Sequence, residues 1–316
     1  MNTNVSAQSQ SNNQPFVLPP LTPETIKRAR QGLEAAQLLK AEAIVEKSLH
    51  QTEAFIQNKS NLKLRGWIRW LLIHTVIHSL FRVKVESLDR LPKQPVIIAP
   101  NHLSHIDPFL ILSEIPDQPY YYILGDARSL YNKFWKRLFL RFSGGTIPLE
   151  RIWKEEIAVL EAAKAGEKNL TELAAAIEQD VPKGNSIQSL RRLDQIVQGV
   201  FAQKKGIIIF PEGRLGFQEG QLFLPLKRGT VIYALKTGVP IVPVGIIGTR
   251  NLYLYKELTI RFGQPLTFPQ INRPKPKDIK IALETLEAAI FDLLPQNYQE
   301  PDELKLFSDF LNHMLW

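Results

Sequence analysis

Cysteine is absent from this sequence of 316 residues, and methionine occurs only 2 times. A chain without cysteine has no disulfide framework, no thiolate ligand for zinc and no cysteine nucleophile. The sequence also lacks an apolar run of the roughly 18–20 residues that a membrane-spanning helix needs. Its nearest candidate, 67–81, is shorter and contains Arg69, His74 and His78. We therefore expect no membrane-spanning segment, whereas a helix that lies on a membrane surface stays open.

The first 20 residues lack the basic start and apolar centre of a secretory signal. They are rich in Asn, Gln and Ser, which predicts a disordered tail over 1–20. The whole chain is 44% hydrophobic and has 39 Lys and Arg against 31 Asp and Glu, a net charge of +8. It can bury a sizeable core, and its charge favours phosphate groups, nucleic acid or an anionic membrane surface.

The remaining chain divides by its hydrophobic periodicity. Residues 21–82 have helical spacing, with Thr22 and Pro23 as a start signal. Over 83–300, short β-branched or aromatic runs alternate with helical patterns, which predicts an α/β domain. Residues 152–203, rich in Ala, Glu, Lys and Leu, predict a helical insertion, and 301–316 predict a C-terminal helix. Strands are expected at 83–86, 96–99, 120–124, 206–210, 241–246 and 258–262.

A first polar motif, Asn101 to Asp107, follows the apolar run 96–99 and precedes an apolar helix. A turn at the start of that helix would bring Asp107 back toward the imidazole of His102. A carboxylate on one ring nitrogen fixes the tautomer and leaves the other nitrogen as a base. The same spacing also fits a capping or core histidine beside a first-turn acid that complements the helix dipole.

A second polar motif, Pro211-Glu212-Gly213-Arg214, follows the apolar run 206–210. Pro211 ends the ladder of the sheet, and Gly213 allows an unusual backbone turn. An arginine at a strand end suits a phosphate, which it can bind through two hydrogen bonds. The alternative is a turn with a solvent-facing ion pair of roughly 0–1 kcal/mol.

Together these motifs resemble the phospholipid/glycerol acyltransferase family, which includes the 1-acylglycerol-3-phosphate acyltransferases. The family's blocks are matched in order by Asn101-His102-x-Ser104-x-x-Asp107, 144–151 ending in Arg151, Phe210 to Arg214, and 239–244. The resemblance covers about 83–265 and implies a glycerol-3-phosphate acyltransferase-like fold, a mixed sheet flanked by helices. Two features differ from the family: Leu215-Gly216 follows Arg214, and the interval between Arg151 and Phe210 is long.

The resemblance also implies a direct acyl transfer. His102 would remove the proton from an acceptor hydroxyl as it attacks an acyl thioester, and Asp107 would orient His102. No bound cofactor is implied, because the thioester is a substrate. Further residues are implied in substrate binding (Arg151, Glu212, Gly213, Arg214) or in support of the loop (Asn101, Ser104).

Residues 59–85 contain no acidic residue and predict contact with a membrane. Trp67 and Trp70 alternate with Arg65 and Arg69, and tryptophans flanked by cations favour the headgroup boundary. The basic and aromatic segment 131–142 also predicts contact with a membrane. For both segments, a helix whose apolar face packs on the core is the alternative.

His74 and His78 are one helical turn apart, as pairs of metal ligands are. No third ligand stands at a recognisable spacing, so we interpret them as interfacial side chains and expect no metal site.

The expected activity is transfer of a fatty acyl group from acyl-CoA or acyl-carrier-protein to the sn-2 hydroxyl of lysophosphatidic acid. This reaction gives phosphatidic acid in phospholipid biosynthesis. The expected partners are these substrates and an anionic membrane surface, with no nucleic acid, and the expected location is peripheral, on the cytoplasmic face. The alternatives are another acceptor (glycerol-3-phosphate, another lysophospholipid or a lipid alcohol) and a catalytically silent lipid-binding protein.

Overall fold

The computed structural model describes residues 18–41, 43–56, 62–131, 136–137, 140, 145–182 and 187–315. The chain forms two compact units, Met1–Glu42 with Arg151–Lys183, and Ala43–Glu150 with Gly184–Trp316. This division differs from the expected boundaries, because the expected insertion is shared between the units. Of the expected tail at 1–20, only 18–20 lie among the described residues.

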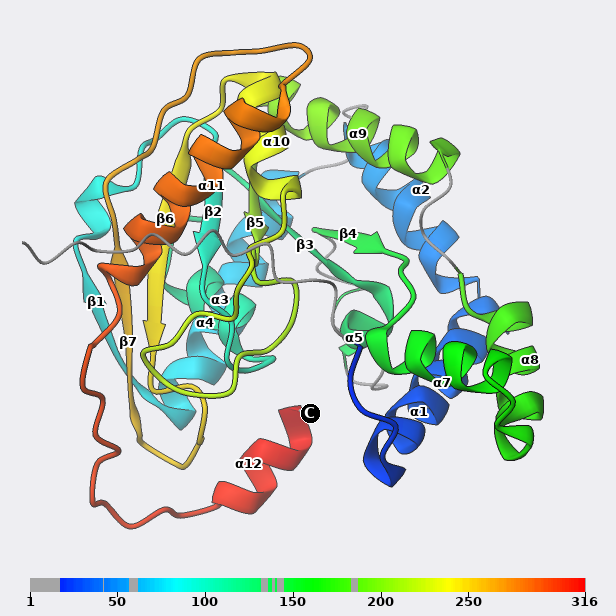
Figure 1. Ribbon diagram of the computed structural model, residues 1–316. Helices are drawn as coiled ribbons and strands as arrows, with labels where there is room; N and C mark the ends of the chain where they lie inside the picture. Colours follow the sequence, from blue (N-terminus) through cyan, green and yellow to red (C-terminus); the bar gives the residue numbers. More distant parts are fainter. Residues whose placement is uncertain are drawn as a thin grey trace, which may run out of the picture. The chain divides into compact units, whose positions relative to one another are not determined.

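The smaller unit is helical. It consists of α1 (Pro23–Ala41), α7 (Lys154–Lys164), η2 (Lys168–Leu170) and α8 (Thr171–Asp180) (Figure 1). Thr22 Oγ1 accepts from the N–H of Thr25 at 3.2 Å, so the predicted start signal caps α1. Small and branched side chains form its core: Ala29, Leu33, Ala36, Val159, Leu160, Leu170, Ala174, Ile177 and Val181.

The larger unit contains the sheet. Its strands are β1 (Arg82–Glu86), β2 (Ile97–Pro100), β3 (Tyr121–Asp126), β4 (Thr146–Leu149), β5 (Gly206–Ile209), β6 (Ile241–Ile247) and β7 (Glu257–Phe262). Their order is β1-β7-β6-β2-β5-β3-β4. The pairs from β6 through β2, β5 and β3 to β4 are parallel, as is β1 with β7, whereas β6 and β7 are antiparallel. The expected mixed sheet is confirmed.

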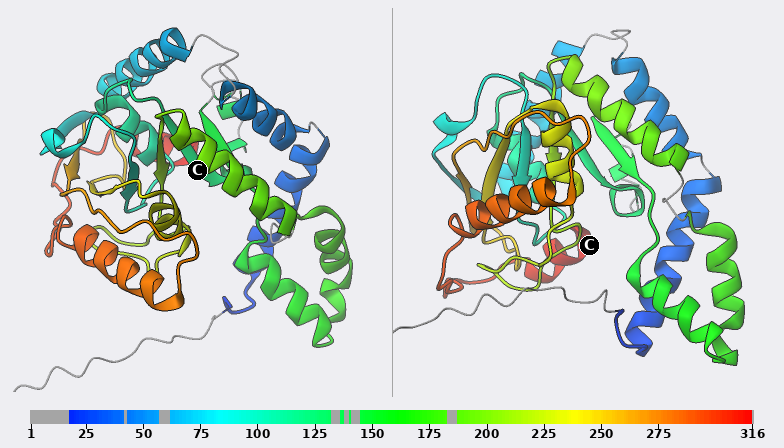
Figure 2. Two further views of the ribbon diagram at one scale, coloured as in Figure 1. Left: turned by 90° about the horizontal axis from the view of Figure 1, so that it is seen from above. Right: turned by 45° about the horizontal axis from the view of Figure 1, so that its top comes forward.

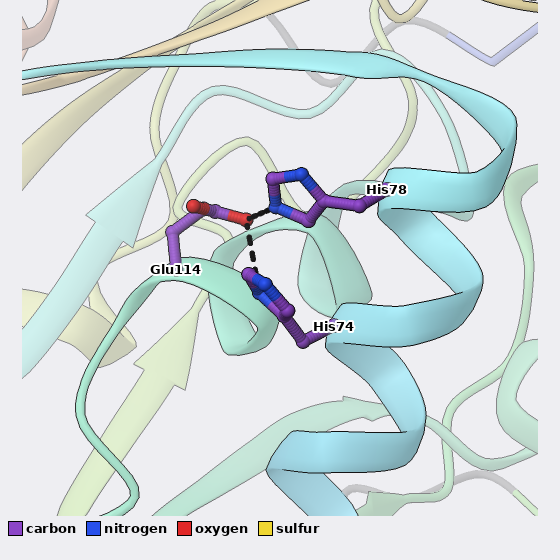
Figure 3. A group of neighbouring side chains, drawn as sticks. All are labelled: His74, His78 and Glu114. Atoms are coloured by element: carbon purple, nitrogen blue, oxygen red, sulfur yellow. Dashed lines mark hydrogen bonds and ion pairs between the residues drawn. The ribbon is translucent and has the colours of Figure 1, made fainter.

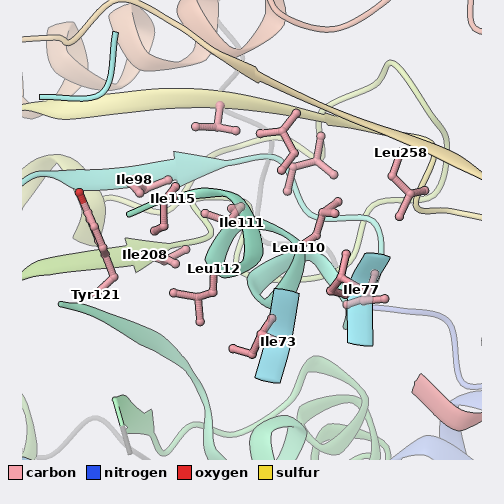
Figure 4. Close-up of a cluster of buried hydrophobic side chains, with 14 of the residues drawn as sticks. Ile73, Ile77, Ile98, Leu110, Ile111, Leu112, Ile115, Tyr121, Ile208 and Leu258 are labelled. Atoms are coloured by element: carbon pink, nitrogen blue, oxygen red, sulfur yellow. The ribbon is translucent and has the colours of Figure 1, made fainter. Parts of the chain in front are cut away.

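Helices cover both faces of this sheet, because alternate residues of each strand point to opposite faces. On one face Ile98 and Ile208 pack with α3 (Leu62–Leu80) and α4 (Asp107–Glu114), as Figure 4 shows. On the other face Ile97 and Ile207 share a core with α9 (Ile187–Ala202), α10 (Gly229–Thr237) and α11 (Pro276–Phe291). The helix α2 (Ile44–Ile56) packs against β4 and α9, and lies beside α9 in Figure 2.

Three short elements complete the larger unit: η1 (Leu88–Arg90), α5 (Ala127–Tyr131) and α12 (Ser308–Leu315). Leu311 of α12 is buried in the core shared with α3 and α4. The helix predicted over 301–316 is shorter in the structure, because α12 begins at Ser308.

The strands β2 and β5 lie next to each other in the middle of the sheet and run parallel. Their carboxyl ends therefore meet at one edge, which brings the two polar motifs of the sequence together.

Candidate active site

His102 and Asp107 form a hydrogen-bonded pair in the loop between β2 and α4. His102 Nδ1 lies 2.9 Å from Asp107 Oδ2. The same oxygen accepts from the backbone N–H groups of Leu103 at 2.7 Å and Ser104 at 2.9 Å. Asp107 is fully buried at the start of α4. The predicted contact between Asp107 and the imidazole is therefore present, and the same carboxylate also orders the loop. The role of His102 as a base stays a prediction.

The imidazole of His102 is held in place and yet remains accessible. Its side chain is 15% exposed, and its ring centroid lies 4.0 Å from that of Phe210, at the end of β5. A carboxylate at Nδ1 favours the tautomer in which Nδ1 carries the hydrogen and Nε2 the lone pair. This is the arrangement that a general base needs.

Glu212 binds backbone instead of facing the solvent. Its Oε1 accepts from the N–H of His102 and its Oε2 from the N–H of Phe223, both at 2.6 Å. The side chain has no exposed surface. Glu212 thus holds the His102 loop in position, and its expected contribution to the substrate site stays a prediction.

The pKa of Glu212 is raised to about 7, mainly because burial disfavours the charged carboxylate. The N–H groups of Phe223 and His102 lower the pKa, and the charge of Asp107 raises it. Glu212 is thus a buried carboxyl group whose protonation changes near neutral pH.

Asn101 joins β2 to β6. Its Oδ1 accepts from the N–H of Ile246 at 2.6 Å, and its Nδ2 donates to the carbonyl of the same residue at 2.9 Å. Ser104 contributes its carbonyl, which accepts from the N–H of Asp107 at 3.1 Å. Both residues hold the loop, which is the role that the sequence predicts for them.

Gly213 and Arg214 follow Glu212 in a tight turn. Gly213 has a φ of 66°, and a Cβ there would lie 2.8 Å from Lys227 Cγ, so the turn favours glycine. The guanidinium of Arg214 lies 4.4 Å from the ring centroid of Phe223 and 5.0 Å from that of Phe217. It is half-buried, and its expected contact with a phosphate stays a prediction.

Arg151 belongs to the helical unit, in the segment that leads from β4 to α7. The sheet unit alone brings together His102, Asp107, Glu212, Gly213 and Arg214. The role of Arg151 in binding a phosphate stays a prediction.

Phe223 was not found from the sequence. Its N–H holds Glu212 and its ring faces Arg214, but it lies in a loop without periodicity. No signal in the sequence marks it.

The residues predicted to contact a membrane lie differently on α3. Trp67 is 51% exposed, whereas Trp70 is half-buried and stacks on His74 with ring centroids 4.8 Å apart. Arg69 is buried, with its guanidinium carbon 3.8 Å from the ring centroid of Tyr120. The burial of Arg69 does not fit its expected contact with a membrane, whereas the exposure of Trp67 does. The side chain of Arg65 and most of 131–142 lie outside the described residues.

Comparison with known proteins identifies the family. The family model described as Acyltransferase matches residues 82–247, and the chain belongs to this family. This stretch contains both polar motifs and runs from β1 to the end of β6.

Two curated relatives are 1-acyl-sn-glycerol-3-phosphate acyltransferases. The protein from Cocos nucifera is 30% identical over 128 residues, which is 39% of this chain and 40% of that one. The alpha form from Homo sapiens is 25% identical over 210 residues, which is 66% of this chain and 59% of that one. This chain thus matches less than two thirds of the length of either relative.

A solved structure, the 1-acyl-sn-glycerophosphate (LPA) acyltransferase PlsC from Thermotoga maritima, aligns with 87% of this chain and all (100%) of that one. The sequence identity is 16% and the TM-score 0.41, too low a similarity to establish a shared fold.

Proposed function

We propose that this protein transfers a fatty acyl group from a thioester, acyl-CoA or acyl-carrier-protein, to the sn-2 hydroxyl of lysophosphatidic acid. The product is phosphatidic acid, a precursor in phospholipid biosynthesis. The observation that carries this proposal is the His102–Asp107 pair at the carboxyl ends of the central strands, in a chain of the acyltransferase family. The names of the curated relatives support the choice of acceptor.

The reaction needs one base and no covalent enzyme intermediate. His102 Nε2 takes the proton from the acceptor hydroxyl as its oxygen attacks the thioester carbonyl carbon. Asp107 stabilises the imidazolium that forms. When the carbon–sulfur bond breaks, the imidazolium returns the proton to the thiolate. The products are an ester and a free thiol, and His102 is neutral again.

Arg214 is the residue of the sheet unit that we assign to the acceptor's phosphate. It follows the Glu212 turn, which is tied to the backbone of His102. A phosphate held there would place the acceptor beside the base. We assign Arg151 to the same phosphate on the resemblance alone.

A competition assay tests the choice of acceptor. Purified protein receives equal concentrations of lysophosphatidic acid, glycerol-3-phosphate, lysophosphatidylcholine and a long-chain alcohol, with either thioester. We expect phosphatidic acid as the main product, and none with His102→Ala. A different main product would replace lysophosphatidic acid as the acceptor. If no acceptor is acylated, the lipid-binding alternative is correct.

We also propose that α3 rests on an anionic membrane surface at the cytoplasmic face. Its outward side chains recur at helical spacing and are apolar, with exposed fractions of 40–55%: Trp67, Ile68, Leu71, Leu72 and Val76. Exposed apolar groups in such a stripe favour burial at the boundary of headgroups and acyl chains. No helix in the described part of the chain is long and apolar enough to cross a bilayer.

Flotation with vesicles tests this surface. We expect the protein to float with vesicles that contain phosphatidylglycerol, and Trp67→Ser with Leu72→Ser to reduce the bound fraction. The matched control changes two exposed apolar residues of α9, Ile187→Ser with Leu190→Ser. Equal flotation of both double variants would contradict the assignment of α3.

A further inference from the structure

Three side chains that the proposed reaction does not use meet between α3 and α4. His74 and His78 project from successive turns of α3, and Glu114 projects from the end of α4, as Figure 3 shows. His78 Nε2 lies 2.7 Å from Glu114 Oε1, and His74 Nδ1 lies 3.9 Å from the same oxygen. One ligand atom of each residue lies within 4.8 Å of the others.

The helices that carry these groups are anchored in the core. Ile73 and Ile77 of α3 and Leu110 and Ile111 of α4 are buried in one cluster (Figure 4). The residues next to the polar groups therefore fix both helices. Groups mounted on two packed helices keep their separation better than groups on a loop.

The rings are also held in orientation. Trp70 stacks on His74, and the ring centroids of His74 and His78 are 4.0 Å apart. Ser113 Oγ donates to Glu114 Oε1 at 2.8 Å, which holds the carboxylate. Hydrogen bonds of this kind to a ligand oxygen are a regular feature of metal sites.

Two imidazoles and one carboxylate are the donor set of open zinc sites. Tetrahedral Zn²⁺ with bonds near 2.0–2.1 Å separates its ligand atoms by about 3.4 Å. The 2.7 and 3.9 Å separations bracket this value, and the three ligand atoms all lie within 4.8 Å of one another, so movements of roughly 1–1.5 Å would complete the site. His74 Nδ1 would exchange its contact with the Ser113 carbonyl, now 3.0 Å away, for the metal.

We propose that His74, His78 and Glu114 bind a divalent transition metal of the zinc class. The two histidine side chains are 35% and 36% exposed, so a metal can enter from solvent and a water can take the fourth position. The bound metal ties α3 to α4 and so stabilises the helix that carries the exposed apolar side chains. The expectation of no metal site rested on the lack of a third ligand, which the fold supplies in Glu114.

The competing explanation is a histidine–carboxylate hydrogen bond without a metal. His50 on α2 is a matched control, since it lies 3.1 Å from Glu46 and 3.5 Å from Glu53, and no second histidine joins this group among the described residues. Both the His50 site on α2 and the site between α3 and α4 therefore contain a histidine beside a carboxylate. The site between α3 and α4 differs because two imidazoles meet one carboxylate there.

Metal binding is measured on the full chain without an affinity tag, after treatment with a chelator. Zn²⁺ is titrated against a chromophoric chelator, and Co²⁺ is used as a probe whose visible absorption reports the geometry. We expect one Zn²⁺ per chain and the intense visible bands of four-coordinate Co²⁺. Zn²⁺ should also raise the Tm, because it binds the folded chain.

Glu114→Gln and His78→Ala should each weaken Zn²⁺ binding at least about tenfold and abolish the rise in Tm. His50→Ala and His102→Ala should bind like the parent. Circular dichroism checks the fold, and His74→Gln replaces any variant that does not fold. The proposal is overturned if the parent chain binds no Zn²⁺, if the site variants bind like the parent, or if His102→Ala abolishes binding.

Discussion

Asp107→Asn separates two contributions of the carboxylate, its charge and its choice of imidazole tautomer. Asp107 Oδ2 faces three N–H donors, at His102 Nδ1, Leu103 and Ser104. Oδ1 is buried and has no hydrogen-bond partner among the described residues. An amide NH₂ in the Oδ2 position would oppose all three donors. The amide oxygen will therefore take that position, and His102 will keep its hydrogen on Nδ1.

The expected loss of activity follows from the charge alone. Unit charges about 4 Å apart at an effective dielectric constant of 20 attract by about 4 kcal/mol. Without that attraction the imidazolium is less stable in the transition state, and kcat/KM should fall by up to roughly 1,000-fold. An inverted tautomer would cost roughly 10,000-fold, the loss found for the corresponding change in serine proteases.

The rate is measured as thiol release from acyl-CoA with lysophosphatidic acid, and the tautomer by ¹⁵N NMR of protein labelled at histidine. Asp126→Asn is the matched control, since Asp126 Oδ1 also accepts from two backbone N–H groups, at Arg128 and Ser129. This control should keep the parent rate. An Asp107→Asn protein with its hydrogen on Nε2 of His102, or with the parent rate, would refute the reasoning.

Three further changes give separate tests. Burial raises the pKa of Glu212 to about 7, so its contribution to the free energy of unfolding falls by roughly 3 kcal/mol as the pH rises from 4.5 to about 7. In Glu212→Gln, the free energy of unfolding measured with urea should therefore vary less with pH over this range. A pH dependence equal to that of the parent would contradict the shift. Arg214→Ala should raise the KM for the acceptor roughly 10- to 100-fold with little change in kcat, and an unchanged KM excludes its phosphate contact. Asn101→Ala leaves the N–H and carbonyl of Ile246 without these partners, so it should lower the free energy of unfolding in urea by about 2–4 kcal/mol and also lower kcat. Its control is Asn312→Ala, which removes the partner of the N–H and carbonyl of Leu252 and should lower the free energy of unfolding but not kcat.

Strand positions were predictable because most strands are short apolar runs with polar or glycine-containing boundaries, whereas β1 and β7 alternate apolar with polar residues. The six expected strands all occur, with ends shifted by at most about two residues, the usual uncertainty of such boundaries. The division into two units was not predictable. Apolar spacing shows that a helix has a buried face but not which element covers it. The core that α1, α7 and α8 share is therefore not indicated by any local pattern in the sequence.

The site was predictable where its partners are close in sequence. His102 and Asp107 are linked by one turn, so their spacing indicates the contact. One partner of Glu212, His102, is 110 positions away, and the partner of Asn101 is 145 positions away. Sequence spacing found these residues but could not tell a substrate contact from a contact with backbone. The same limit hid Glu114, which meets His78 across 36 positions.

Three buried polar side chains converge on the single loop that carries His102. Asn101 ties it to β6, Glu212 to the loop after β5, and Asp107 to its own helix. Removing such groups from water is costly, and well-packed apolar residues would often stabilise a fold as much or more. Their shared effect is to hold one imidazole against Phe210 with its Nδ1 hydrogen-bonded. Stability alone does not account for this concentration of buried polar groups, whereas a base that must be positioned before its substrate arrives does.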